Sequence, residues 1–363
     1  MVDRSTSGGM PNSAAGGGAT FVDLSGNGRY VVFYSTASNL TTTTSRVGGN
    51  VFVRDMVLDK TIEVVRSSTG GIANGYSTRP TISGDPDTNG NYYVTYNSKA
   101  SNLVAGVTGG PSDIYVTQFH PAALTVSTPK LVSRSLSGGA SNGINLHAEI
   151  SSDGGYIAFQ GTSSNLTSND TDTILDVFES ANPFLDSTAR PELVSVSTAG
   201  VKGRAPSGRP AINGNGDEVA FESSANNLVS GDTNAVMDAF LRGTRAGAFI
   251  GTGNTIRVSV DYFGNQLPAA TSRPNLDGLG DKVGFASNSR TVVKGDLNGS
   301  RDVFLRDLRT DTNYLIDVCQ SGGYGGTGCT ASAAAATASP QTASPETVAV
   351  LDVGHRGDVY RPR

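Results

Sequence analysis

One segment of the chain recurs five times in fixed register, and this repeat constrains the fold more than any other feature. Its clearest copy is NLVSGDTNAVMDAF, from Asn227 to Phe240. In every copy an apolar residue lies ten positions before the Asn or Asp that opens the next apolar run. This Asn or Asp ends the loop before the run, and we call it the closing residue. The five closing residues are Asn50, Asp113, Asp176, Asp238 and Asp302. They are 63, 63, 62 and 64 residues apart, a period that favours propeller-type architecture.

Each repeat predicts four short strands. In the fourth repeat they cover 209–213, 218–223, 238–243 and 255–260, where apolar and polar residues alternate. Gly, Asn and Asp between these runs supply the geometry of hairpin turns. The 46 glycines of the chain and its lack of Trp fit strands joined by tight turns better than helices. We therefore predict an all-β fold.

The two ends of the chain predict how a ring of repeats closes. Residues 347–352 and 358–361 resemble a second and a third strand, with no fourth strand after them, whereas a copy of the fourth strand stands at 2–9. Pairing this segment into the last blade would remove two exposed sheet edges. The sequence thus predicts a single six-bladed β-propeller domain of four-stranded antiparallel blades, the last closed by the N-terminal strand. The predicted blades are 10–72, 73–140, 141–202, 203–265, 266–323, and 324–363 with 1–9.

The repeat resembles that of the TolB-like six-bladed propellers of bacterial extracellular proteins, SxDGxxVAFxSxxxNLVxGDTNxxxDVFLRD…LVSVSxxG. In this chain the matching segments include NLVSGDTN from Asn227, DVFLRD from Asp302 and LVSVSTAG from Leu193. The resemblance covers nearly the whole chain and implies the fold. It does not imply one function, because propellers of this kind have many roles.

Three of the five loops carry oxygen ligands at positions i, i+2 and i+6. These are Asp170, Asp172 and Asp176; Asp232, Asn234 and Asp238; and Asp296, Asn298 and Asp302. Such oxygens can surround a hard cation, for which Ca²⁺ is the natural candidate. The alternative is that these residues cap turns and that the closing residue has a structural role. Thr44 and Arg46, and Val107 and Gly109, replace the first two ligands in the other loops, which keep the closing residue.

A second candidate site consists of basic residues in the predicted first strands. Arg79, Arg209 and Arg273 each precede a proline, and His147 has the matching place in the third repeat. A ring of these side chains could bind an anionic ligand. The alternative is a salt bridge between each of them and a closing Asp.

The two cysteines, Cys319 and Cys329, lie in a Gly-rich segment, where we predict that they form a disulfide. A disulfide would place the chain in an oxidising compartment, so we expect it to be extracellular or periplasmic. The net charge of -5 gives no reason to expect nucleic-acid binding. The chain has no run of 18 apolar residues, so the sequence predicts no membrane-spanning helix.

The sequence nominates no catalytic residue. It has three histidines and lacks the HExxH and GxSxG patterns. We therefore predict a non-catalytic scaffold that binds a protein or a glycan, has Ca²⁺-stabilised loops and could belong to a larger surface assembly. The alternative is a hydrolase or lyase with an active site in the central channel.

Overall fold

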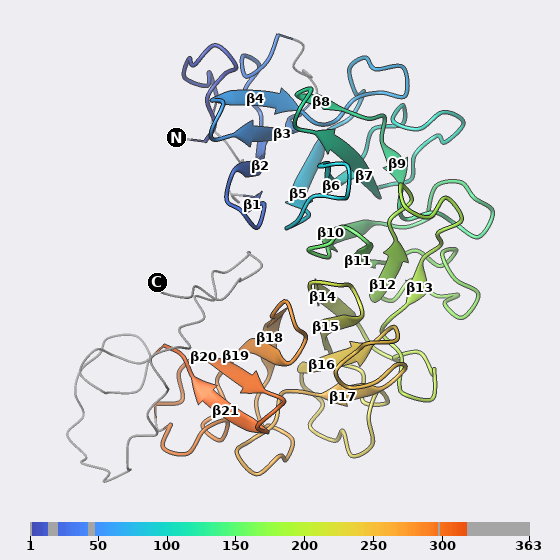
Figure 1. Cartoon of the computed structure of the whole chain (residues 1–363). Helices are drawn as coiled ribbons and strands as arrows, with labels where there is room; N and C mark the ends of the chain where they lie inside the picture. Colours follow the sequence, from blue (N-terminus) through green and yellow to red (C-terminus); the bar gives the residue numbers. More distant parts are fainter. Residues whose placement is uncertain (1, 14–20, 43–47, 297, 318–363) are drawn as a thin grey trace. The chain divides into compact units, whose positions relative to one another are not determined.

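The computed structural model describes residues 2–13, 21–42, 48–296 and 298–317. The regular secondary structure of this part of the chain consists of strands alone, β1 to β21, which form five antiparallel sheets (Figure 1). In four of the sheets four strands pair in chain order, as expected for successive hairpins, and the second sheet has a fifth strand beside its third. The predicted all-β fold of antiparallel repeats is therefore confirmed for the described residues.

The first compact unit, Met1–Val194 with Gly214–Gly216, contains three sheets. The first sheet consists of β1 (Val22–Leu24), β2 (Tyr30–Ser35), β3 (Asn50–Asp55) and β4 (Lys60–Glu63). The second consists of β5 (Ser77–Ile82), β6 (Tyr92–Ser98), β7 (Asp113–His120) and β8 (Thr125–Val126), with β9 (Lys130–Leu131) also paired to β7. The third consists of β10 (Asn145–Ile150), β11 (Tyr156–Gly161), β12 (Asp176–Ala181) and β13 (Glu192–Leu193).

The second unit, Ser195–Asn213 with Asp217–Arg363, contains two sheets among its described residues. The fourth sheet consists of β14 (Ser207–Ile212), β15 (Glu218–Ser223), β16 (Asp238–Gly243) and β17 (Thr255–Arg257). The fifth consists of β18 (Thr271–Leu276), β19 (Lys282–Ser287), β20 (Asp302–Asp307) and β21 (Thr312–Leu315).

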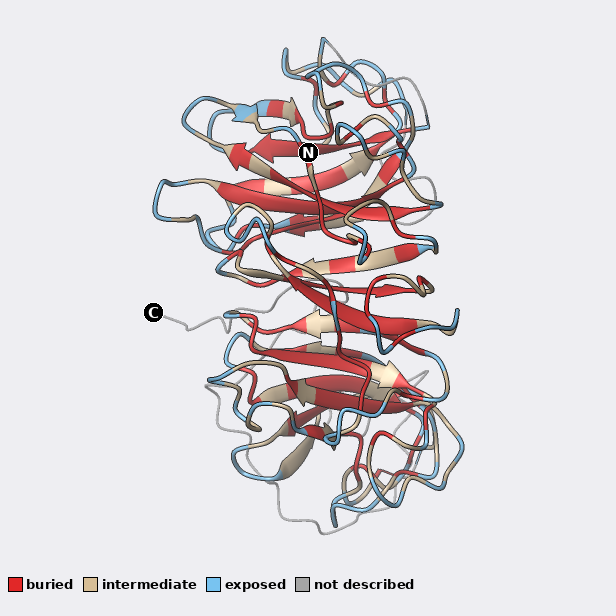
Figure 2. Cartoon of the chain, turned by 90° about the vertical axis from the view of Figure 1, so that its right-hand side faces the viewer, coloured by how far each residue is buried: buried red, intermediate tan, exposed pale blue. Residues whose placement is uncertain are grey.

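The second and third strands of every sheet carry its core. They are almost fully buried, while exposed residues gather in the loops (Figure 2). An aromatic pair lies directly across these two strands in each sheet, with ring centroids 5.6 to 6.1 Å apart. The pairs are Phe33–Phe52, Tyr96–Tyr115, Phe159–Phe178, Phe221–Phe240 and Phe285–Phe304. Such pairs fix the register, because a slip of one residue would move each ring to the opposite face.

Glycines close the turns between the first and second strands, as the sequence predicts. Gly28, Gly154, Gly216 and Gly280 have φ angles of 67°, 74°, 73° and 79°. A side chain is strained in this left-handed region, which glycine adopts freely.

The predicted fourth strand of the fourth sheet is longer than the observed one. The prediction covers 255–260, but β17 ends at Arg257. Beyond it the Ala239 amide donates to Ser259 Oγ at 3.0 Å, so a side chain replaces a backbone partner of the ladder.

The N-terminal segment behaves as the end of a fourth strand. The Thr6 amide donates to the Leu40 carbonyl at 2.9 Å, and the equivalent Ser68 and Leu136 amides donate to the Asn102 and Asn165 carbonyls, one position earlier in their repeats. Residues 2–9 are not themselves assigned to a strand. The predicted strands 347–352 and 358–361 and the Cys319–Cys329 disulfide lie outside the described residues. The six-blade count, the single domain and the ring closure therefore stay predictions.

Candidate metal centre

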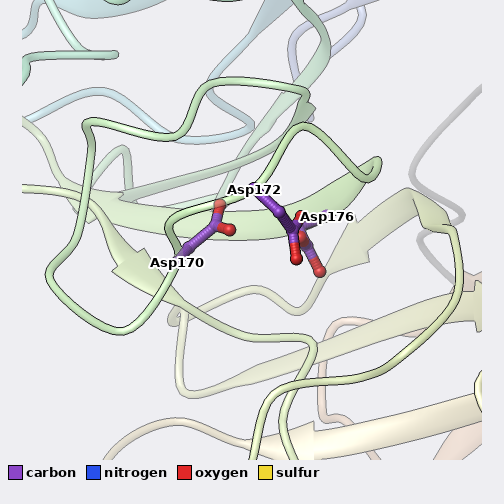
Figure 3. Close-up of side chains that lie close together, drawn as sticks. All are labelled: Asp170, Asp172 and Asp176. Carbon is purple, nitrogen blue, oxygen red and sulfur yellow. The ribbon is translucent and has the colours of Figure 1, made fainter.

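Three carboxylates meet in the loop between β11 and β12. Asp170, Asp172 and Asp176 each offer one oxygen, and these oxygens lie within 4.8 Å of one another (Figure 3). Asp170 and Asp176 are fully buried, whereas Asp172 is exposed. Carboxylate oxygens at such spacing suit a hard cation, so this cluster can hold a metal ion.

A buried apolar residue fixes the frame of each loop. Leu166 is fully buried ten positions before Asp176. Its counterparts Leu40, Leu103, Leu228 and Val292 are at most 2% exposed. The Ile174 amide donates to Asp172 Oδ1 at 2.8 Å, an Asx turn that holds the centre of the loop. The recurring spacing in the sequence is thus the distance from this anchor to the first residue of the third strand.

Side-chain nitrogens surround the closing residue in the fourth sheet. Asn234 Nδ2 and Ser259 Oγ donate to Asp238 at 3.0 and 2.9 Å. Arg257 Nη1 lies 3.7 Å from both an Asp238 oxygen and an Asp232 oxygen. Burial raises the pKa of Asp238, and the bonds from Ser259 and Asn234 and the charge of Arg257 oppose the rise. The Arg257 guanidinium therefore lies against both carboxylates of this loop, and Ca²⁺ binding by Asp232, Asn234 and Asp238 stays a prediction.

Hydrogen bonds within the chain also satisfy the closing residues of the first two sheets. Asn50 Nδ2 donates to Glu63 Oε1 at 2.6 Å. Asp113 accepts bonds from the hydroxyls of Ser133 and Ser141 at 2.7 and 2.6 Å, and from the Gly110 amide at 2.7 Å. Buried polar groups need such partners, and these bonds tie the loop to the chain at or beyond the fourth strand. The geometry in these sheets supports the structural role of the closing residue.

The partners on the fourth strand were missed by the sequence analysis. Glu63 and Arg257 lie opposite Phe52 and Phe240, respectively, in the strand pairing. Their signal was present, because each is the first residue of the recurring fourth-strand motif, EVVRSSTGG from Glu63 and RVSVDYFG from Arg257. Nothing local, however, shows that this first residue faces the closing residue of the neighbouring strand.

The four basic residues of the first strands share an unusual backbone conformation. Arg79, His147, Arg209 and Arg273 have φ angles of 54°, 52°, 50° and 53°. Each lies at an irregularity in the pairing of the first two strands. A β-bulge of this kind re-aims a side chain, and the left-handed conformation costs about 1–2 kcal/mol for a residue with a Cβ.

The contacts of these residues differ from the predicted salt bridge to a closing Asp. The Arg79 guanidinium contacts the His147 ring nitrogen and lies over the Phe21 ring, 4.4 Å from its centroid. Arg209 Nε lies 3.2 Å from Glu222 Oε1, and Glu222 Oε2 accepts a bond from the Arg273 amide at 2.8 Å. Phe21 and Glu222 are partners that no repeat of the sequence predicts. An anion-binding role for the four basic residues stays a prediction.

Solved structures of several propeller-type proteins are similar to this chain. Putative TolB from Agrobacterium tumefaciens is 16% identical, with a TM-score of 0.44 over 82% of this chain and 79% of that one. TolB from Acinetobacter baumannii is 12% identical, with a TM-score of 0.37 over 82% and 52%. An oligogalacturonate lyase in complex with manganese is 12% identical, with a TM-score of 0.47 over 81% and 63%. TolB is thus among the structures that the chain resembles, as the repeat predicts.

No protein-family model and no curated protein matches the sequence. Among the described residues, no helix is long and apolar enough to span a membrane.

Proposed function

We propose that this chain is a non-catalytic, extracytoplasmic β-propeller that binds a protein partner through its loops and is stabilised by Ca²⁺. The observation that carries the proposal is the carboxylate cluster of Asp170, Asp172 and Asp176. It lies in a loop that joins two buried strands. A cation held there would stiffen the loop without adding a reactive group. The proposal also includes a glycan as the partner and membership of a larger surface assembly.

The partner-binding part of the proposal is supported by exposed apolar side chains that recur in the connections between successive sheets. In antiparallel sheets, the loops between strands two and three emerge at the same end as the connections to the next sheet. In the first unit these connections expose Met10, Ile72 and Leu136, which are 59%, 50% and 58% exposed. Val201, Tyr262 and Phe263 are exposed in the corresponding connections of the second unit. Recurring exposed apolar side chains on loops of a rigid scaffold favour a protein-binding surface.

Ca²⁺ is expected to raise the unfolding temperature of the chain, and Asp172→Ala is expected to reduce this rise. Asp172 is exposed, so its replacement by alanine removes a ligand with little effect on the core. A ligand at about 100 times its dissociation constant stabilises the folded state by about 2.7 kcal/mol. Thermal unfolding in Ca²⁺ and in EDTA measures the effect, and Asp153→Ala at an exposed turn of the same sheet is the matched control. Equal midpoints of the wild type in Ca²⁺ and EDTA would refute the cation site.

Replacing both Ile72 and Leu136 by serine is expected to weaken partner binding and to leave the fold intact, because both side chains are largely exposed. Cross-linking followed by mass spectrometry identifies the partner, and its affinity for the purified variants is then measured. The matched control is Val57→Ser, which changes a 70% exposed residue in the turn at the other end of the first sheet. A partner whose affinity depends on Val57 and not on Ile72 and Leu136 would contradict the proposed surface.

A further inference from the structure

Two buried carboxylates, one inside the loop between β19 and β20 and one at its end, have oxygens without hydrogen-bond donors in the described part of the chain. Asp302 is fully buried, and among the described residues neither of its carboxylate oxygens has a hydrogen-bond partner. Asp296 is 2% exposed, and its Oδ2 likewise has no partner in the described part of the chain. A buried carboxylate without a donor is costly, because the water that it loses is not replaced.

A third carboxylate comes from the chain just beyond β21. Asp317 Oδ1 accepts a bond from the Val303 amide at 3.0 Å. In the second and fourth sheets a serine hydroxyl accepts the same bond at 3.0 Å, and that hydroxyl then donates to the closing Asp. Asp317 thus stands where Ser133 and Ser259 stand, and it replaces a donor to the closing residue by a second acceptor.

The fifth sheet also lacks the arginine that faces the carboxylates of the fourth sheet. Leu315 pairs with Phe304 as Arg257 pairs with Phe240, so an apolar side chain takes the place of the guanidinium. Burial, followed by the charges of Asp317 and Asp296, raises the pKa of Asp302 to about 6. Arg290 is the cation that acts on Asp296, and it is exposed to solvent. The charges of Asp296 and Asp317 therefore act on a buried Asp302 that has no hydrogen-bond donor among the described residues. The oxygens of these three carboxylates do not all lie within 4.8 Å of one another, so a shared cation would have to draw them together.

We propose that Asp296, Asp302 and Asp317 bind a divalent cation, of which Ca²⁺ has the matching preference for hard oxygen ligands. Asp317 replaces Asn298 in the predicted ligand set, because Asp317 Oδ1 accepts its bond from the amide directly after Asp302. The cation ties the loop before β20 to the chain that leaves the fifth sheet. This inference rests on the proposed function, because both assume loops that a cation stabilises. The ligands proposed in the fifth sheet are different residues from those of the third sheet.

Two substitutions test the site, and each introduces the residue that another repeat of this chain carries at the same position. Asp317→Ser installs the residue that the second and fourth sheets carry, and Leu315→Arg installs the guanidinium of the fourth sheet. Each variant is expected to bind one fewer Ca²⁺ per chain in titration calorimetry at neutral pH. Each is also expected to unfold at a higher temperature than the wild type in EDTA and to gain less from added Ca²⁺. Asp311→Ser, which changes an 83% exposed side chain of the same sheet, is the matched control and should bind as the wild type does.

The outcomes separate this site from that of the third sheet. If Asp317→Ser and Leu315→Arg bind as many Ca²⁺ ions as the wild type, the proposal is overturned. It is also overturned if Asp172→Ala alone abolishes all binding. If Asp172→Ala binds as the wild type does while Asp317→Ser loses one ion, the fifth-sheet site stands and the third-sheet site fails.

Discussion

Arg257→Leu is expected to lower the free energy of unfolding by about 3 kcal/mol in EDTA, because it leaves two buried carboxylates without their cation. The guanidinium is 12% exposed, and the side chains of Asp232 and Asp238 that it faces are 5% and 0% exposed. Leucine is the residue that the second, third and fifth sheets carry at this position, as Leu131, Leu193 and Leu315. The change is therefore compatible with the fold and removes chiefly the charge.

Chemical unfolding of Arg257→Leu in EDTA and in Ca²⁺ measures this effect. We expect Ca²⁺ to restore part of the lost stability, because Asp232, Asn234 and Asp238 then resemble the cation sites proposed for the other sheets. Arg204→Leu, at an exposed position of the same unit, is the control and should change little. A variant as stable as the wild type in EDTA would show that the hydrogen bonds from Ser259, Asn234 and Gln266 suffice to hold the two carboxylates.

Phe240→Ala is expected to lower the free energy of unfolding by about 4 kcal/mol, because it leaves a cavity in the core of the fourth sheet. Phe240 is fully buried on β16, and its ring stacks on Phe221 of β15 with centroids 5.8 Å apart. The loss combines the transfer of a buried ring to water with the loss of the aromatic pair.

Urea unfolding measures this second effect, with Phe263→Ala as the control. Phe263 is 75% exposed, so its replacement should change the free energy by no more than about 0.5 kcal/mol. Equal losses for the two variants would mean that the stacked pair across the second and third strands does not carry the core.

The repeat alone predicted the described fold closely, because the information is local. Alternation within a run fixes which side chains can share a face, and a glycine such as Gly280 marks a turn that needs a positive φ. The end of β17 at Arg257 was missed, because a side chain of the same segment competes with the ladder for the Ala239 amide.

The candidate sites, like the fold, were predicted from the sequence only in part. The sequence by itself determined that every loop ends on a closing residue ten positions after a buried apolar anchor, since both belong to one segment. Only the tertiary structure decided what faces that residue: Glu63 in the first sheet, Arg257 in the fourth and Asp317 in the fifth. These partners come from the other side of a hairpin, where the pairing register sets their position. Whether a closing carboxylate meets a donor or a second carboxylate is therefore a property of the folded sheet.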